Sequence, residues 1–206
     1  LFDAADDIGG QLNMAKQVPG KEEFHEMLRY FKRRVELTGV KLHLQTRVDA
    51  AMLQGYDEVI VATGVNPRDP KIPGQDHPKV LSYIDVLRHK KPVGKKVAVI
   101  GAGGIGFDVA EYLVHDGHST TLDLEAWKAE WGVTDPALAP GGLSTAKPEV
   151  TPPARDVVLL QRKKGKLGAG LGKTTGWIHR STLKMKNVEM VGGVNYERIG
   201  DEGLLI

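Results

Sequence analysis

The sequence contains no cysteine, and this absence excludes several kinds of chemistry at once. Without thiols the chain can form no disulfide, no C-x-x-C redox centre, no thiolate-bound iron–sulfur cluster and no cysteine-ligated zinc site. If the protein carries out redox chemistry, the electrons that pass through this chain must therefore travel on organic cofactors.

Long apolar runs and a strong charge imbalance are also missing. No stretch of about 18 apolar residues is present to span a membrane, and the N-terminus LFDAADDIGG lacks the basic start of a signal peptide. The formal net charge is only +2, with 26% charged residues, so the charge balance predicts neither a nucleic-acid nor a membrane partner. We therefore expect a cytoplasmic protein.

Glycine, in contrast, is plentiful, and one stretch, KVAVIGAGGIGFDVAEYL at 96–113, follows a defined pattern. Gly101, Gly103 and Gly106 match the G-x-G-x-x-G spacing between an apolar strand, expected to be buried, and an amphipathic helix. We expect Gly101 to permit the tight turn, Gly103 to let backbone approach a pyrophosphate, and Gly106 to let the helix pack close to the strand. The helix N-terminus favours an anion there. The stretch therefore predicts a dinucleotide site.

Other patterns predict α/β units on both sides of a proline-rich segment. Apolar spacing predicts a helix over 21–38, and apolar runs predict strands at 40–44 and 58–62. Proline is too frequent over 66–74 for regular structure, so we expect a hinge there. Ser82 is suited to cap a short helix before the glycine-rich stretch. Further strands are expected at 156–161, 187–191, 196–199 and 203–206.

These elements predict a Rossmann-like α/β protein with a parallel sheet. We expect one partial unit at 1–65, a proline-rich hinge at 66–80 and a fuller unit at 81–206. The fuller unit holds an insertion at 118–154, whose aromatic residues we expect in turns. Because the chain starts without methionine at a strand end and stops within a strand, we interpret it as a fragment of a longer protein.

Two segments compete to contact the adenosine ribose of the dinucleotide. An acidic residue about 20 positions after the glycines bonds the 2′-OH of NAD, and Asp123 and Glu125 lie at that distance. Their segment alternates polar and apolar residues, however, and would make a poor central strand. The apolar run 157–160 is followed instead by Arg162 and Lys163, which are suited to a 2′-phosphate. This favours NADPH, the alternative being a solvated basic loop.

A second glycine-rich segment imitates a phosphate-binding loop. Gly172-Lys173-Thr174 resembles the end of a P-loop, but Leu167 stands where the first glycine is required. We expect Gly170 and Gly172 instead to shape a backbone nest or a mobile loop over the cofactor.

The histidines indicate neither a catalytic residue nor a metal ligand. His179 lies in a predicted helix with no Asp or Ser pattern to build a relay, so we expect a structural role. His115 and His118 have i, i+3 spacing without a third ligand, which is typical of a surface pair.

Segments spread over almost the whole chain resemble a known family. They are LFDAADDIGGQLNMAKQVPGKEEF, HPKVLSYIDVL, KVAVIGAGGIGFDVAEYL, AEWG, GGLS, LQRK and GLGKTTGWIHR. They resemble the bacterial NADPH-dependent 2,4-dienoyl-CoA reductases of fatty acid β-oxidation, which are related to old yellow enzyme and trimethylamine dehydrogenase. The resemblance implies an N-terminal barrel with FMN and a 4Fe–4S cluster, followed by FAD and NADPH domains. Electrons would pass from NADPH through FAD and the cluster to FMN and then to the dienoyl-CoA.

The resemblance also implies roles for individual residues. Those placed along FAD are Asp3 at the ribose, Gly9, Gly10 and Gln11 in the following turn, Val48 at the adenine, Ala62, Thr63 and Gly64 in an A-T-G signature, and Arg68 after it. Those placed at NADPH are Gly101, Gly103, Gly104, Gly106, Arg162 and Lys163. Accordingly, 1–65 would belong to an FAD domain and 81–206 to an NADPH domain.

Parts of that family pattern are missing from this chain. The FAD fingerprint before Asp3, the cluster cysteines and the barrel with its catalytic acid are absent, so we do not expect this chain alone to reduce a dienoyl-CoA. We expect it to present NADPH for hydride transfer to flavin. One alternative is an electron-transfer relative of the trimethylamine dehydrogenase kind, with a vestigial or ADP-filled site. Another is a redox-sensing or interaction module that binds a dinucleotide without turnover.

Overall fold

The computed structural model describes residues 1–206 and divides the chain into two compact units. Unit 1 comprises Leu1–Gln17 and Lys21–Pro70, and unit 2 comprises Val18–Gly20 and Lys71–Ile206. The main division follows Pro70, inside the segment 66–80 expected to be a hinge. That this hinge separates an FAD domain from an NADPH domain stays a prediction.

Unit 1 contains two helices, α1 (Leu12–Ala15) and α2 (Glu23–Leu37). The second confirms the helix predicted over 21–38. Leu28 is the buried residue of α2. A Cβ added at Gly9 would lie 2.5 Å from a Leu28 methyl carbon, so the turn before α1 packs closely on this side chain.

Neither of the strands expected in unit 1 forms, so these two predictions were wrong. Of 40–44, only His43 takes part in an isolated parallel bridge, with Phe2. The segment 58–62 is irregular, and Ile60 and Val61 are 91% and 78% exposed. A strand needs a neighbour that satisfies its backbone N–H and C=O groups. No strand lies beside 58–62 in unit 1, and its apolar side chains stay in solvent.

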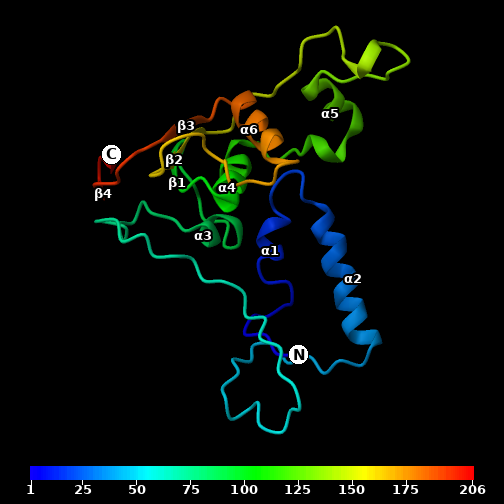
Figure 1. The fold of residues 1–206 in the computed structure, drawn as a ribbon, viewed down its shortest axis with the longest axis vertical. Helices are drawn as coiled ribbons and strands as arrows, with labels where there is room; N and C mark the ends of the chain where they lie inside the picture. The colour runs from blue at the N-terminus through cyan, green and yellow to red at the C-terminus, as the bar shows by residue number, and fades with distance from the viewer. The chain divides into compact units, whose positions relative to one another are not determined.

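Unit 2 is built on a parallel sheet of β1 (Lys96–Ile100), β2 (Asp156–Gln161) and β3 (Glu189–Gly192), which lie in that order. Helix α4 (Gly104–Val114) follows β1, and helix α6 (Gly176–Met185) connects β2 to β3 (Figure 1). Helix α4 packs on β1 and β2 and against α6. This arrangement confirms the predicted Rossmann-like α/β fold.

The core of unit 2 lies between β2 and the two helices. Leu159 of β2, Phe107 and Leu113 of α4 and Leu183 of α6 are all fully buried. The expectation that 97–100 is equally buried was wrong, because β1 is an edge strand of the sheet and only β2 has a neighbour on each side.

A short helix and a hairpin complete the regular structure outside the insertion. Helix α3 (Tyr83–Leu87) begins at the predicted cap, where the Ser82 hydroxyl accepts from the Asp85 N–H at 3.1 Å. Strands β4 (Arg198–Gly200) and β5 (Gly203–Leu205) lie where the last two apolar runs predicted strands, and they pair antiparallel. None of the helices combines the length and apolar character needed to cross a bilayer.

The insertion at 118–154 is more regular than expected. It contains the 3-10 helices η1 (Thr120–Leu122) and η2 (Pro140–Gly142) and the helix α5 (Leu124–Trp131). Trp127 and Trp131 lie one turn apart on α5 with ring centroids 6.4 Å apart, so the assignment of these aromatic residues to turns was wrong.

Candidate dinucleotide site

The turn after β1 favours glycine at two positions, for two different reasons. Gly101 has a φ of +105°, which favours glycine, and its N–H donates to the Leu160 carbonyl at 2.8 Å. A Cβ at Gly106 would lie 1.7 Å from the Gly101 carbonyl oxygen. The first turn of α4 therefore rests directly against the end of β1.

The outer side of the same turn is open. A Cβ at Gly103 or Gly104 would meet no atom within 4 Å. Gly103 is the N-cap of α4, no side chain caps the helix, and its first turn carries no acidic residue. The N-terminal N–H groups of an uncapped helix and its dipole attract an anion. The turn therefore fits a diphosphate.

A basic loop follows β2 at the same edge of the sheet. β1 and β2 run parallel in register up to the pair Ile100 and Leu160. Because the carboxyl ends of parallel strands meet at one edge, Arg162 and Lys163 follow β2 on the edge that carries the glycine turn. Both side chains are exposed, and no carboxylate pairs with either.

The backbone of this basic loop is held in place by hydrogen bonds. The Gln161 side-chain amide donates to the carbonyls of Lys163 at 2.9 Å and Gly165 at 3.3 Å. The Gly193 N–H, just after β3, also donates to the Lys163 carbonyl at 3.1 Å. The loop is thus braced from its own strand and from the neighbouring one.

The acidic alternative for the ribose contact does not lie at a strand end. Asp123 is the N-cap of α5, where its carboxylate accepts from the N–H groups of Glu125 and Ala126, each at 3.1 Å. The second strand of the sheet is β2, and no acidic residue occurs over 157–188. The basic residues of that range are Arg162, Lys163, Lys164, Lys166, Lys173, Arg180, Lys184 and Lys186.

The glycine-rich loop between β2 and α6 packs on the helix of the candidate site. Gly168 has a φ of +69°, and a Cβ there would lie 2.7 Å from the Phe107 ring. Its carbonyl accepts from the Arg180 guanidinium at 3.1 Å. That Gly170 and Gly172 form a nest over a cofactor stays a prediction.

Tyr196, which no sequence pattern indicated, lies on the segment that leads from β3 along the basic loop. Its hydroxyl oxygen is buried without a hydrogen-bond partner. Burial raises the pKa of Tyr196, while the positive charge of Arg162 opposes that rise.

The histidines are engaged in local contacts. His179 Nδ1 on α6 lies 3.3 Å from Glu111 Oε2 on α4, and both side chains are mostly buried. His115 Nδ1 lies 3.3 Å from the His118 carbonyl. No group of three or more His, Cys, Asp or Glu side chains is arranged to hold a metal ion.

In unit 1, the residues placed along FAD are only partly brought together. The Asp3 carbonyl accepts from the Thr46 N–H at 2.9 Å, which holds Asp3 close to the segment that leads to Val48. Gly10 has a φ of +47°, and Gln11 is the N-cap of α1.

The remaining FAD candidates lie apart from any strand. Ala62–Gly64 and Arg68 occupy irregular, exposed chain. Unit 1 by itself therefore forms no sheet edge at which an FAD ribose would bind. The FAD contacts stay a prediction.

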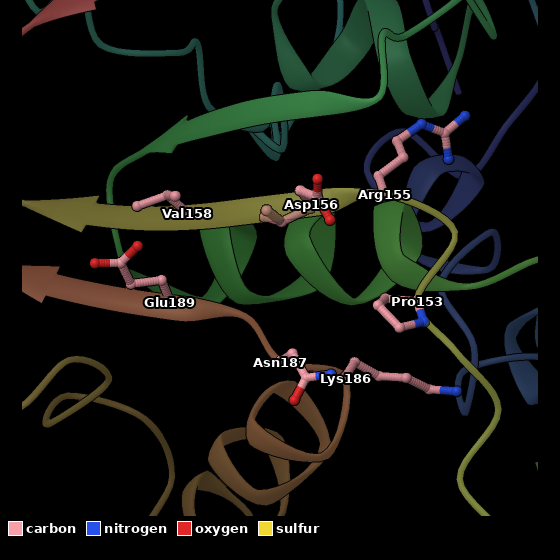
Figure 2. A pocket seen from close by; sticks show the side chains of 8 residues that line it. Pro153, Arg155, Asp156, Val158, Lys186, Asn187 and Glu189 are labelled. Carbon is pink, nitrogen blue, oxygen red and sulfur yellow. The ribbon is translucent and has the colours of Figure 1, made fainter.

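The opposite edge of the sheet carries a cavity of about 210 Å³ (Figure 2). Asp156 and Val158 of β2 and Glu189 of β3 line it, together with Arg155 before β2 and Lys186 before β3. These residues belong to the amino ends of the strands, so the cavity is separate from the glycine turn. Its lining contains charges of both signs.

Lys186 is buried at this amino edge and is neutralised within the protein. It is 2% exposed, and its ammonium group donates to the Thr151 carbonyl at 3.0 Å and lies 3.6 Å from Glu130 Oε1. Glu130 also accepts from the Thr120 hydroxyl at 2.6 Å. The network joins the insertion to the end of α6.

Comparison with known proteins places this geometry in a family. Residues 25–204 match the family model described as pyridine nucleotide-disulphide oxidoreductase. A metal reductase of Desulforamulus reducens is 24% identical over 212 residues, which cover 100% of this chain and 30% of that protein. A bilirubin reductase of Mediterraneibacter gnavus is 37% identical over 119 residues, which cover 57% of this chain and 19% of that protein.

A solved structure shows the same fold over nearly the whole chain. The structure of a 2-naphthoyl-CoA reductase in complex with 2-naphthoyl-CoA matches 98% of this chain and 25% of that one, with a TM-score of 0.72 and 25% identity. The chain thus spans less than a third of the length of each of these proteins. It belongs to the pyridine nucleotide-disulphide oxidoreductases, a family of enzymes that bind FAD and NAD(P)H.

Proposed function

We propose that the chain binds NADPH at the carboxyl edge of its parallel sheet and presents it for hydride transfer to a flavin. One observation carries this proposal: Arg162 and Lys163 directly follow β2, which lies in register beside the strand of the glycine turn. Bound NADPH supplies the hydride, and the protein contributes binding, orientation and charge.

Each part of the edge has a defined task in this proposal. The open turn at Gly103 and Gly104, with the N-terminus of α4, holds the diphosphate. The Arg162 guanidinium would hold the 2′-phosphate, and Lys163 would add a point charge. A carboxylate at this place would repel that phosphate. The absence of acidic residues over 157–188 therefore favours NADPH over NADH.

We further propose that the chain is the nucleotide-binding part of a flavoenzyme similar to the 2,4-dienoyl-CoA reductases. The structural likeness to a 2-naphthoyl-CoA reductase supports an acyl-CoA substrate for the whole enzyme. FMN and a 4Fe–4S cluster would be held by a barrel domain of the same polypeptide. This chain contains no cysteine to bind a cluster or to form a redox disulfide.

The substitution Arg162→Ala tests the phosphate site. It should weaken NADPH binding by about 1–3 kcal/mol and leave NADH binding nearly unchanged, because only NADPH carries the group that Arg162 contacts. Isothermal titration of the full chain at one salt concentration measures both affinities. Lys184→Met is the matched control, because it also removes one exposed positive charge but lies in the last turn of α6.

Equal losses for both dinucleotides would contradict the role of Arg162. A chain that binds neither would favour the alternative with a vestigial nucleotide site.

A further inference from the structure

The side chain of Gln161, the last residue of β2, is bound to the backbone of the basic loop that follows it. Its amide nitrogen donates to the Lys163 carbonyl at 2.9 Å and to the Gly165 carbonyl at 3.3 Å. A carboxamide nitrogen carries two N–H groups, so this one side chain can serve both carbonyls. The chain that contains Arg162 and Lys163 is therefore bent back towards the end of its own strand.

The end of β3 supports the same two carbonyls. The Gly193 N–H donates to the Lys163 carbonyl at 3.1 Å. A Cβ added at Gly192 would lie 2.9 Å from the Gly165 carbonyl oxygen and 3.2 Å from that of Lys163. Gly192 does not have a positive φ, so the need for glycine at this position comes from the close approach of the loop.

These contacts fix the backbone of the loop and leave its charged side chains available. Arg162 and Lys163 are exposed, while the neighbouring carbonyls are hydrogen-bonded within the protein. A loop that is already ordered loses less conformational entropy when it binds a ligand, and a guanidinium binds phosphate best in a defined orientation. NADH has no phosphate for these side chains, so its affinity does not depend on their orientation.

We propose that Gln161 is a positioning residue for cofactor specificity, which holds the basic loop in the conformation that presents Arg162 and Lys163 to the 2′-phosphate of NADPH. This inference rests on the proposed function and adds to it the residue that orders the phosphate-binding loop. The amide of Gln161 is engaged with the loop carbonyls, so Gln161 acts through the two basic side chains and not as a ligand of the phosphate.

The substitution Gln161→Met keeps the length of the side chain and removes its donors. In the full chain, calorimetric titration should show NADPH binding weakened about three- to tenfold, as expected for the loss of neutral hydrogen bonds, with NADH affinity unchanged. Amide hydrogen exchange at Gly193 should become faster, because its acceptor on Lys163 is held less firmly. A residue that only supports the fold would not change the ratio of the two affinities.

A combined variant tests whether Gln161 acts through the basic side chains. In a protein that already carries Arg162→Ala and Lys163→Ala, Gln161→Met should cause no further loss of NADPH affinity. A further loss as large as in the wild-type background would overturn the positioning role.

Gly192→Ala disturbs the same loop without removing the donors of Gln161. The added Cβ would displace the Gly165 and Lys163 carbonyls, so this variant should also weaken NADPH binding and leave NADH binding unchanged. Gly200→Ala is the matched control, because a Cβ there meets no atom within 4 Å, and it should change neither affinity.

The inference about Gln161 can fail separately from the proposed function. If Gln161→Met and Gly192→Ala both retain the wild-type preference for NADPH, the inference is wrong, while a selective loss in Arg162→Ala still supports the proposed function. If the wild-type protein shows no preference for NADPH, both are overturned.

Discussion

The two edges of the sheet in unit 2 differ in whether their positively charged groups are paired within the protein. At the amino edge, the buried ammonium of Lys186 is paired with Glu130 and hydrogen-bonded to Thr151. At the carboxyl edge, the side chains of Arg162 and Lys163 are exposed, and neither forms an ion pair. Both edges carry cations, but only one of them neutralises its cations internally.

This difference separates groups that stabilise the fold from groups that are available to a ligand. Buried charges must be compensated, and the amino edge compensates them with its own side chains. At the carboxyl edge, an open glycine turn and an uncapped helix N-terminus follow β1. Exposed basic residues follow β2, the neighbouring strand. An anionic ligand such as the diphosphate and 2′-phosphate of NADPH would satisfy all of them.

The largest effect is expected where the carboxyl edge is most tightly packed. Gly106→Ala places a Cβ 1.7 Å from the Gly101 carbonyl oxygen, so α4 must move away from β1. We expect destabilisation above the roughly 1–3 kcal/mol of ordinary overpacking, because the clash is with backbone, and loss of binding for both NADPH and NADH. Urea unfolding and titration measure the two effects.

Gly104→Ala is the folding control for this variant. An added Cβ at Gly104 meets no atom within 4 Å, so the free energy of unfolding should not fall. Full binding by a folded Gly106→Ala protein would contradict the assignment of the turn to the diphosphate.

At the amino edge we expect a narrower effect, on stability alone and not on binding. Lys186→Met leaves Glu130 buried without its cation, which typically destabilises a protein by about 3–5 kcal/mol. Lys184→Met, an exposed neighbour on α6, should have little effect. Urea unfolding measures both, and folded Lys186→Met protein should bind NADPH as wild type does. Weaker NADPH binding by that folded protein would contradict the assignment of the amino edge to stability and of the carboxyl edge to ligand binding.

The smallest effect is expected at α3, which belongs to neither edge. Ser82→Ala removes the cap of this helix and should lower the free energy of unfolding by about 1 kcal/mol without changing nucleotide affinity.

The Lys91 ammonium and the Ser82 hydroxyl and N–H hold the pKa of Asp85 well below its usual range. The resulting stabilisation is present above about pH 4 and is lost as pH falls towards the lowered pKa.

The unfolding free energy of Asp85→Asn, compared with wild type over pH 3–7, checks this direction. The difference between the two proteins should shrink as pH falls. A difference that grows below pH 4 would contradict the role of the carboxylate.

The sequence predicted unit 2 well because its signals are local. Apolar runs and glycine spacing located β1, α4 and β2, and the side-chain cap located α3. The helix α5 was missed although Asp123 and Gly132 stand at its two ends. Gly132 adopts the left-handed conformation that ends many helices, and this pair of caps was the available signal.

Features that depend on distant partners could not be predicted in the same way. The run 58–62 has the composition of a strand but finds no neighbour in unit 1. The pairing of Lys186 with Glu130 and the isolation of the Tyr196 hydroxyl follow from tertiary packing between segments far apart in the chain. No residue spacing encodes either of them.

We propose above all that the carboxyl edge of the sheet binds a dinucleotide that carries a 2′-phosphate. Calorimetric titration of the full chain with NADPH and then NADH, at one fixed salt concentration, tests it most directly, because the two ligands differ only in the 2′-phosphate. We predict tighter binding of NADPH. Equal affinity for both, or tighter binding of NADH, would contradict it.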